Sequence, residues 1–162
     1  MNAFLILKMR IEISNKQNNN PVNRKSIKKL AQYLMDRINR FERGKGCSCL
    51  SILLTDDTGI QPLNRIYLDK TGITDVISLR YSSIPGETGL FSADLIVNIE
   101  QAINNSTSRW SASKELALYI AHGCDHLMGE TDSSETGRRR MRRRELGWLK
   151  EAAKLNMISD LI

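Results

Sequence analysis

The stretch SASKELALYIAHGCDHLMG, residues 111–129, combines a strong helical pattern with both histidines of the chain. Its apolar residues recur with the period of an α-helix, and Gly129 is a typical residue for ending one. His122 and His126 are four residues apart, so a helix places them on one face with their Cβ atoms about 5 to 6 Å apart. The stretch therefore predicts a helix that presents two imidazoles side by side.

Two imidazoles at this spacing can bind one divalent metal ion, and zinc suits imidazole ligands. A catalytic zinc ion usually has three protein ligands and one open position, but the chain has no third histidine. Asp132 offers a carboxylate six residues after His126, and Glu130 is a less favoured alternative. Other interpretations stay open: the histidines could form a surface pair or pack in the core. In the sequence DSSE, Asp132 could instead cap the next helix, with Glu135 completing a capping box.

The rest of the chain predicts strands and helices in an irregular order. A chain of 162 residues suits one domain with one core. Residues 24–41 carry an amphipathic helical pattern, formed by Ile27, Leu30, Ala31, Leu34 and Ile38. Strands are predicted at 1–14, 47–57, 74–81 and 90–99, turns at 42–46 and 82–89, a short helical turn at 58–69 capped by Thr58, and helices at 100–110 and 133–155. Without regular βαβ repetition, this order predicts a single α+β domain over residues 1–162, with a small mixed β-sheet packed with helices.

The positive charge of the chain is concentrated in one predicted helix. Residues 138–154 carry eight Lys and Arg against two Glu, which equals the whole formal net charge of +6. Six of the eight are arginines around Met141. Arginines bind phosphates with sequence-independent, salt-dependent affinity, so this helix is a candidate for binding nucleic acid. The alternative is a solvated helix face in which Glu145 and Glu151 form intrahelical ion pairs.

Cysteine usage indicates a reducing compartment, and the hydropathy of the chain argues against a membrane span. The three cysteines are Cys47, Cys49 and Cys124, and an odd number without a signal peptide argues against a disulfide framework. No apolar run reaches the roughly 18 residues of a membrane span. The first residues lack the basic start and the cleavage site of a signal peptide. We therefore expect a cytoplasmic protein with no membrane association.

Three ordered motifs resemble the YbeY family of bacterial endoribonucleases. HGCDHLMGETD, residues 122–132, is similar to the family's HGxLHLxGYDH, with Asp132 in the place of its third histidine. LNRIYLDKTGITDVISL, residues 63–79, is similar to LNxxYRxxDxPTDVLSF at the same spacing. ADLIV, residues 93–97, looks like the family's GDIVI. The order of the remaining elements also agrees, so the resemblance covers nearly the whole chain.

The resemblance implies a zincin-like metal-binding helix and one Zn²⁺ per chain, held by His122, His126 and Asp132. It also implies cleavage of an RNA phosphodiester in ribosomal RNA maturation, with ribosomal RNA and the small ribosomal subunit as partners. Asp75, in the TDVIS segment, is the candidate for orienting a metal ligand. The basic residues expected to bind RNA are Lys70, Arg80, Arg138, Arg139, Arg142 and Arg143.

Two departures from the family pattern leave alternatives. Leu68 stands where the family usually has an arginine, so Lys70 or Arg80 would have to take over its contact with phosphate. Asp125 stands where the family has an apolar residue, either as a partner or proton carrier beside the ligands or at the solvent edge of the helix. A non-catalytic RNA- or ribosome-binding factor is thus the runner-up function. A metallopeptidase is disfavoured, because Gly123 follows the first histidine where such enzymes carry their glutamate base.

Overall fold

The computed structural model describes residues 9–39, 46–81 and 89–162 of the chain. Residues 1–8 of the strand predicted at 1–14, and most of the turns predicted at 42–46 and 82–89, lie outside the described residues. Four strands form one mixed sheet in the order β1-β2-β4-β3. β1 (Arg10–Asn15), β2 (Gly46–Thr55) and β4 (Leu90–Asn98) are parallel, and β3 (Val76–Tyr81) pairs antiparallel with β4. The predicted α+β fold with a small mixed sheet is therefore confirmed.

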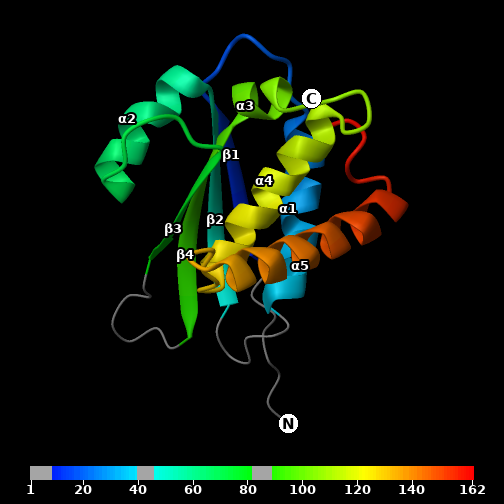
Figure 1. Cartoon of the computed structure of the whole chain (residues 1–162). Coiled ribbons are helices and arrows are strands. Elements are labelled where there is room, and N and C mark those ends of the chain that lie inside the picture. Colours follow the sequence, from blue (N-terminus) through cyan, green and yellow to red (C-terminus); the bar gives the residue numbers. More distant parts are fainter. Residues whose placement is uncertain (1–8, 40–45, 82–88) are drawn as a thin grey trace.

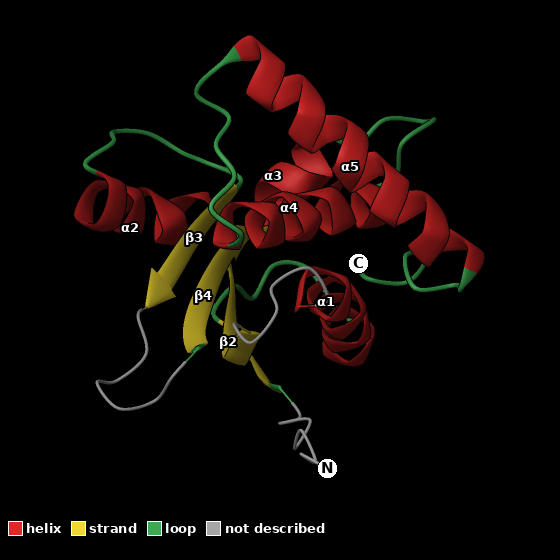
Figure 2. Ribbon diagram, turned by 90° about the horizontal axis from the view of Figure 1, so that it is seen from below, coloured by secondary structure: helices red, strands yellow, loops and turns green. Residues whose placement is uncertain are grey.

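The helices of the described residues form layers against this sheet (Figure 1). α1 and α4 cover one face, and α5 crosses α4 on the side away from the sheet, while α2 lies on the opposite face (Figure 2). As a result, α4 is enclosed on two sides. The bounds are α1 (Arg24–Asn39), α2 (Asp57–Leu68), α3 (Ile99–Asn104), α4 (Ala112–Leu127) and α5 (Glu135–Lys154).

The main core lies between the sheet and the layer of α1 and α4. The five residues predicted for the apolar face of α1 are all buried. They pack with the inward side chains of β2 and β4, including Leu50, Leu54 and Leu95, and with the apolar residues of α4. A smaller cluster around Ile60 and Ile77 holds α2 on the other face. This arrangement fixes α4 against the sheet.

Two predicted local features are wrong. The short helical turn predicted at 58–69 is helical as expected but forms a longer helix of 12 residues, Asp57–Leu68, and its N-cap is Asp56, not Thr58. The Asp56 carboxylate accepts a hydrogen bond from the backbone N–H of Gly59 at 2.9 Å, and the Thr58 hydroxyl donates to the same oxygen. A carboxylate at this position satisfies an N–H group that has no partner within the helix. The helix predicted over 100–110 is shorter, since α3 ends at Asn104.

Gly123 allows α4 to lie directly on the sheet. A Cβ atom at this position would lie 2.9 Å from Leu95 Cδ2 and 3.0 Å from Val76 Cγ2. The Ser78 hydroxyl donates a hydrogen bond to the Gly123 carbonyl at 3.1 Å, which ties β3 to the same turn of the helix. Because both sides of the contact are buried, there is no room for a side chain.

No helix in the described part of the chain is long and apolar enough to cross a membrane.

We expect the substitution Gly123→Ala to lower the free energy of unfolding by about 2 kcal/mol, because overpacking a buried contact outweighs the better helix propensity of alanine. Chemical denaturation measures the change. Gly147→Ala is the matched control, since a Cβ atom at Gly147 meets nothing within 4 Å. That control should raise stability by up to about 1 kcal/mol. Equal effects of the two substitutions would contradict the close contact at Gly123.

Candidate active site

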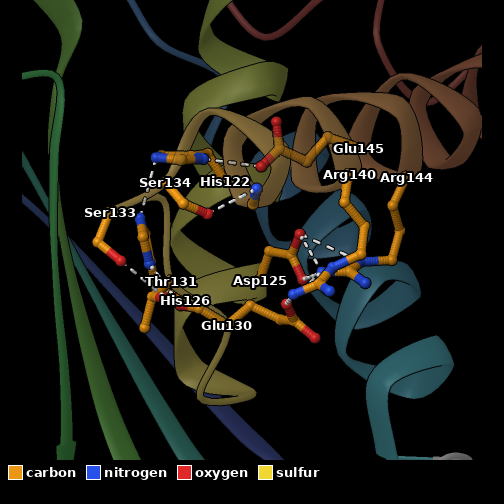
Figure 3. Close-up of polar contacts among 11 residues, drawn as sticks. His122, Asp125, His126, Glu130, Thr131, Ser133, Ser134, Arg140, Arg144 and Glu145 are labelled. Atoms are coloured by element: carbon orange, nitrogen blue, oxygen red, sulfur yellow. Dashed lines mark hydrogen bonds and ion pairs between the residues drawn. The ribbon is translucent and has the colours of Figure 1, made fainter.

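The last turns of α4 bring the two histidines together. The helix begins after Ser111, whose hydroxyl accepts a hydrogen bond from the N–H of Lys114, and ends at Met128. Gly129 follows with a φ of +84°, so the predicted helix stop is confirmed. The rings of His122 and His126 meet edge to face with centroids 4.4 Å apart. Their Nε2 atoms face each other at 3.0 Å (Figure 3).

The other nitrogen of each ring contacts an oxygen that can only accept a hydrogen bond. His122 Nδ1 lies 2.7 Å from Glu145 Oε1, and His126 Nδ1 lies 3.0 Å from the backbone carbonyl oxygen of Glu130. Each Nδ1 therefore carries a proton, and in the neutral rings each Nε2 carries a lone pair. Two lone pairs at 3.0 Å repel each other unless a metal ion, or a proton on one of the rings, lies between them. The histidine pair is thus arranged as two neighbouring metal ligands.

Asp132 completes a group of three ligand donors. One donor atom from each of His122, His126 and Asp132 lies within 4.8 Å of the others. Asp132 does not cap α5, so the alternative interpretation of DSSE is wrong: the N-cap is Ser134, whose hydroxyl accepts from the N–H of Gly137 at 3.0 Å. Arg138 Nη1 donates to the backbone carbonyl of Asp132 at 2.8 Å, which holds this segment beside the histidines.

Glu130 is turned away from this group. Its carboxylate forms ion pairs with Arg140 at 2.8 Å and with Arg144 at 3.5 Å. These partners, Arg140 first, lower the pKa of the Glu130 carboxyl. Glu130 therefore contributes its backbone carbonyl to His126, and its carboxylate belongs to an ion-pair network on the far side of the loop.

Glu145 is the site residue that the sequence-based prediction missed. The alternative interpretation of the basic helix gave it an intrahelical ion pair, but it is 2% exposed and lies against His122 (Figure 3). Burial is the largest single influence on the pKa of His122, and it lowers this pKa. Glu145, Asp75 and Asp132 raise it by more in total, so the pKa of His122 is raised overall. One signal was present in the sequence: Glu145 occupies the buried stripe of α5, four residues after Met141 and four before Leu149.

Asp125 faces α5 and does not contact the histidines. It is 1% exposed, so its predicted place at the solvent edge is wrong. Both of its oxygens accept hydrogen bonds from Arg144, at 2.7 to 3.2 Å. A bidentate pair with arginine is how a buried carboxylate is commonly stabilised. Its contacts thus place Asp125 in the joint between α4 and α5.

Asp75 lines the same cleft as His122, but in the described part of the chain it forms no hydrogen bond with either histidine ring. Its Oδ1 accepts from the N–H of Val76 at 2.8 Å and from the Thr74 hydroxyl at 3.1 Å. The position that was predicted for Asp75, beside the free nitrogen of a histidine ligand, is occupied by Glu145.

The cleft around the site is a cavity of about 610 Å³. Arg138 and Arg142, one turn apart on α5, line it together with His122 and Asp132. The other basic residues predicted to bind RNA are exposed but are not among its lining residues. Arg139 pairs with Glu135 at 2.6 Å. Arg80 donates to the carbonyl of Leu127 at 2.7 Å, and its guanidinium stacks on the Phe91 ring, 3.8 Å from the centroid.

Comparison with known proteins gives a consistent picture. A family model described as Endoribonuclease YbeY matches residues 12–153. The Endoribonuclease YbeY of Rhodopirellula baltica is 34% identical over 111 residues, which cover 65% of this chain and 56% of that protein. The protein of the same name from Geobacter metallireducens is 30% identical over 147 residues, which cover 85% of this chain and 91% of its own length.

The extent of the match differs between relatives. The chain spans about half the length of the relatives from Rhodopirellula baltica and Anaeromyxobacter, at 56% and 53%. Among solved structures, the solution structure of TM1509 from Thermotoga maritima superposes with a TM-score of 0.55 and 18% identity, covering 91% of this chain and 94% of that protein. At this identity, the likeness shows a shared fold.

We expect Glu145→Gln to weaken the binding of a divalent metal ion by tenfold or more, because a neutral amide holds the imidazole of His122 less firmly and makes it less basic. Competition with a chromophoric chelator measures the affinity. Glu151→Gln is the matched control, since Glu151 lies on the same helix and pairs only with Lys154 among the described residues. Unchanged metal affinity in Glu145→Gln would contradict the orienting role of this carboxylate.

Proposed function

The chain belongs to the YbeY endoribonuclease family, and from this membership and the geometry of the cleft we propose that it is a metal-dependent endoribonuclease acting in ribosomal RNA processing. The observation that carries the proposal is the pair of Nε2 atoms 3.0 Å apart, with both Nδ1 protons held by oxygen acceptors. This arrangement suits a divalent cation, and the arginines beside it suit a phosphate.

Zinc is the proposed metal, one ion per chain, with His122, His126 and Asp132 as ligands. Two imidazoles and one carboxylate are a typical ligand set for a catalytic zinc ion, which leaves one position open. With Zn–N distances of about 2.0 to 2.1 Å, a tetrahedral ion separates its nitrogen ligands by about 3.3 Å. The 3.0 Å between the Nε2 atoms is close to this value.

A bound zinc ion would lower the pKa of its water ligand towards 7 and polarise a phosphoryl oxygen. The residues of this chain would do the rest. Glu145 holds the proton of His122 Nδ1 and so keeps Nε2 directed into the cleft. Asp132, in the place of the family's third histidine, adds a negative charge that makes water at the site less acidic than three histidines would. Arg138 and Arg142 would position the scissile phosphate from α5.

The two competing functions find less support. A peptidase of the H-E-x-x-H type needs a glutamate directly after its first histidine, and the contact of Gly123 with Leu95 and Val76 leaves no room for one. For a non-catalytic RNA-binding factor, the ligand group and its buried partner Glu145 would have no use. The relatives named above carry the name of an endoribonuclease, so the catalytic function is the better supported one.

RNA would bind along the arginine face of α5. Arg138 and Arg142 are the proposed inner contacts, while Arg139, Arg143, Lys70 and Arg80 would add long-range attraction from outside the cavity. Ribosomal RNA in the small subunit is the proposed partner. The whole chain, residues 1–162, would act as one domain in the cytoplasm.

Elemental analysis of protein purified without an affinity tag tests the metal site. We expect about one zinc per chain in the wild type and its loss in both His126→Ala and Asp132→Ala. Cleavage of structured ribosomal RNA should require the metal and stop on addition of a chelator. Zinc retained in Asp132→Ala would remove Asp132 from the ligand set. RNA cleavage that a chelator does not affect would exclude the proposed mechanism.

The arginines of α5 are tested by the salt dependence of RNA affinity. Each lost phosphate contact reduces the slope of log K against log salt by about 0.7 for single strands. We expect the pair Arg138→Ala and Arg142→Ala to reduce the slope by more than 1 and to lower affinity strongly. The matched pair Arg139→Ala and Arg143→Ala removes the same charge from outside the cavity and should change the slope less. Equal effects of the two pairs would contradict a specific phosphate site.

A further inference from the structure

The cavity has a second wall, opposite in chemistry to the arginines of α5. It is built from the segment before β3, from α3 with its C-cap, and from the first half of α4. Its polar members, here called the acceptor wall, are Asp75, Gln101, Asn105 and Glu115. They line the same cavity as His122, Asp132, Arg138 and Arg142. None of the four has a role in the proposed hydrolysis.

Gln101 is held with its oxygen free. Its Nε2 donates to both oxygens of Asp57, at 2.9 and 3.0 Å, and Asn98 Nδ2 donates to the same carboxylate at 2.7 Å. A carboxylate only accepts hydrogen bonds, so the amide cannot turn over without placing oxygen against oxygen. Gln101 Oε1 is therefore left as an acceptor, and it has no donor among the described residues.

Asn105 and Asp75 each add a further oxygen to the wall, although the partner of Asn105 is a hydroxyl and not a carboxylate. Asn105 Nδ2 donates to the Tyr119 hydroxyl at 2.8 Å, which leaves Asn105 Oδ1 without a donor in the described part of the chain. Asp75 receives its two hydrogen bonds on Oδ1, from Val76 and Thr74, so that Oδ2 is available. The carboxylate of Glu115, which interacts with the Tyr119 hydroxyl, is the fourth acceptor group of this wall.

The pKa of the Tyr119 hydroxyl reflects the negative charge of this wall. Burial raises its pKa to about 12, and the negative charges of Glu115 and Asp75 add to the increase. The phenol therefore stays protonated at neutral pH. A ligand group placed here meets acceptors and negative charge, which favour a donor such as an amine.

Apolar side chains lie beside these acceptors. Ile73, Leu118 and Met141 also line the cavity, and Ile73 is 50% exposed. Leu118 and Met141 are almost completely buried, so Ile73 is the apolar side chain that offers surface to the flat face of a nucleobase, while the acceptor wall meets its edge. The cleft thus has a cationic side for a phosphate and a hydrogen-bonding side for the base attached to it.

We propose that the acceptor wall is a nucleobase subsite that prefers bases with an exocyclic amine, adenine, cytosine or guanine, over uracil. The chemistry is that of the base edges: adenine N6 and cytosine N4 carry donors where uracil, like thymine, has the acceptor O4. Uracil offers a single donor, N3–H, between two carbonyl oxygens, and these oxygens would face the acceptors of the wall without a proton between them. This inference rests on the proposed function in so far as the ligand is single-stranded RNA.

Binding of labelled RNA hexamers of A, C or U tests the subsite, with a chelator present so that cleavage cannot occur. Fluorescence anisotropy gives the three dissociation constants. We expect the C and A hexamers to bind about tenfold more tightly than the U hexamer, the order of one net hydrogen bond. In the double variant Asn105→Ala with Glu115→Gln, which adds a donor to the wall, the preference should shrink to about twofold or less.

Glu151→Gln serves as the control, because it removes one negative charge from an exposed position of α5 outside the cavity and should leave the preference unchanged. The three free hexamers stack to different extents. This difference cancels when the base preference of the variant is compared with that of the wild type. Equal affinity for all three, tighter binding of U, an unchanged preference in the double variant, or no binding at all would overturn the subsite. Cleavage with metal restored is measured separately, so failure of the proposed activity is distinguishable from failure of the base preference.

Discussion

The hydrogen bond between His122 and Glu145 joins α4 and α5, the two helices whose side chains line the candidate site. Glu145 is almost completely buried, and a buried carboxylate is costly unless it has a partner that compensates for the lost hydration. That partner is a ring nitrogen on α4, 2.7 Å away. The bond sets the rotation of α5 against α4, and the buried pair of Asp125 with Arg144 sets it a second time, one helical turn along α4. Together they fix the position of α5 beside the site.

This fixed position divides the arginine cluster into parts with different roles. Arg140 and Arg144 are committed to Glu130 and Asp125 and belong to the framework. Arg138 and Arg142 line the cavity, one turn apart on the same side of α5. A helix run with arginine in almost every direction therefore presents only part of its charge to the cleft. The cationic side of the cleft comes from α5 and does not involve Leu68 at the end of α2.

The candidate metal ligands depend on a series of close contacts that starts at the sheet. Gly123 lets α4 lie against β3 and β4, and Gly129 ends the helix with a left-handed turn directly after His126. The loop that follows brings its Glu130 carbonyl to His126 and its Asp132 carboxylate to the pair of imidazoles. An aspartate in the place of a histidine keeps a possible ligand but changes the charge of the group, and Arg138 donates a hydrogen bond to its backbone carbonyl.

Local patterns in the sequence determined the elements and the ligand pair. The apolar spacing of α1, the spacing of His122 and His126 and the helix stop at Gly129 are all properties of one or two helical turns, so they were predictable without the fold. The motifs of the YbeY family extended this to the fold class and to Asp132. The tertiary structure alone decided that Glu145 pairs with a histidine 23 residues earlier, that Asp125 is buried against Arg144, that Ser134 caps α5, and which arginines face the cleft. In most of these cases the partner lies on another element, and the free energy of burying a charge depends on that partner, which no local pattern contains.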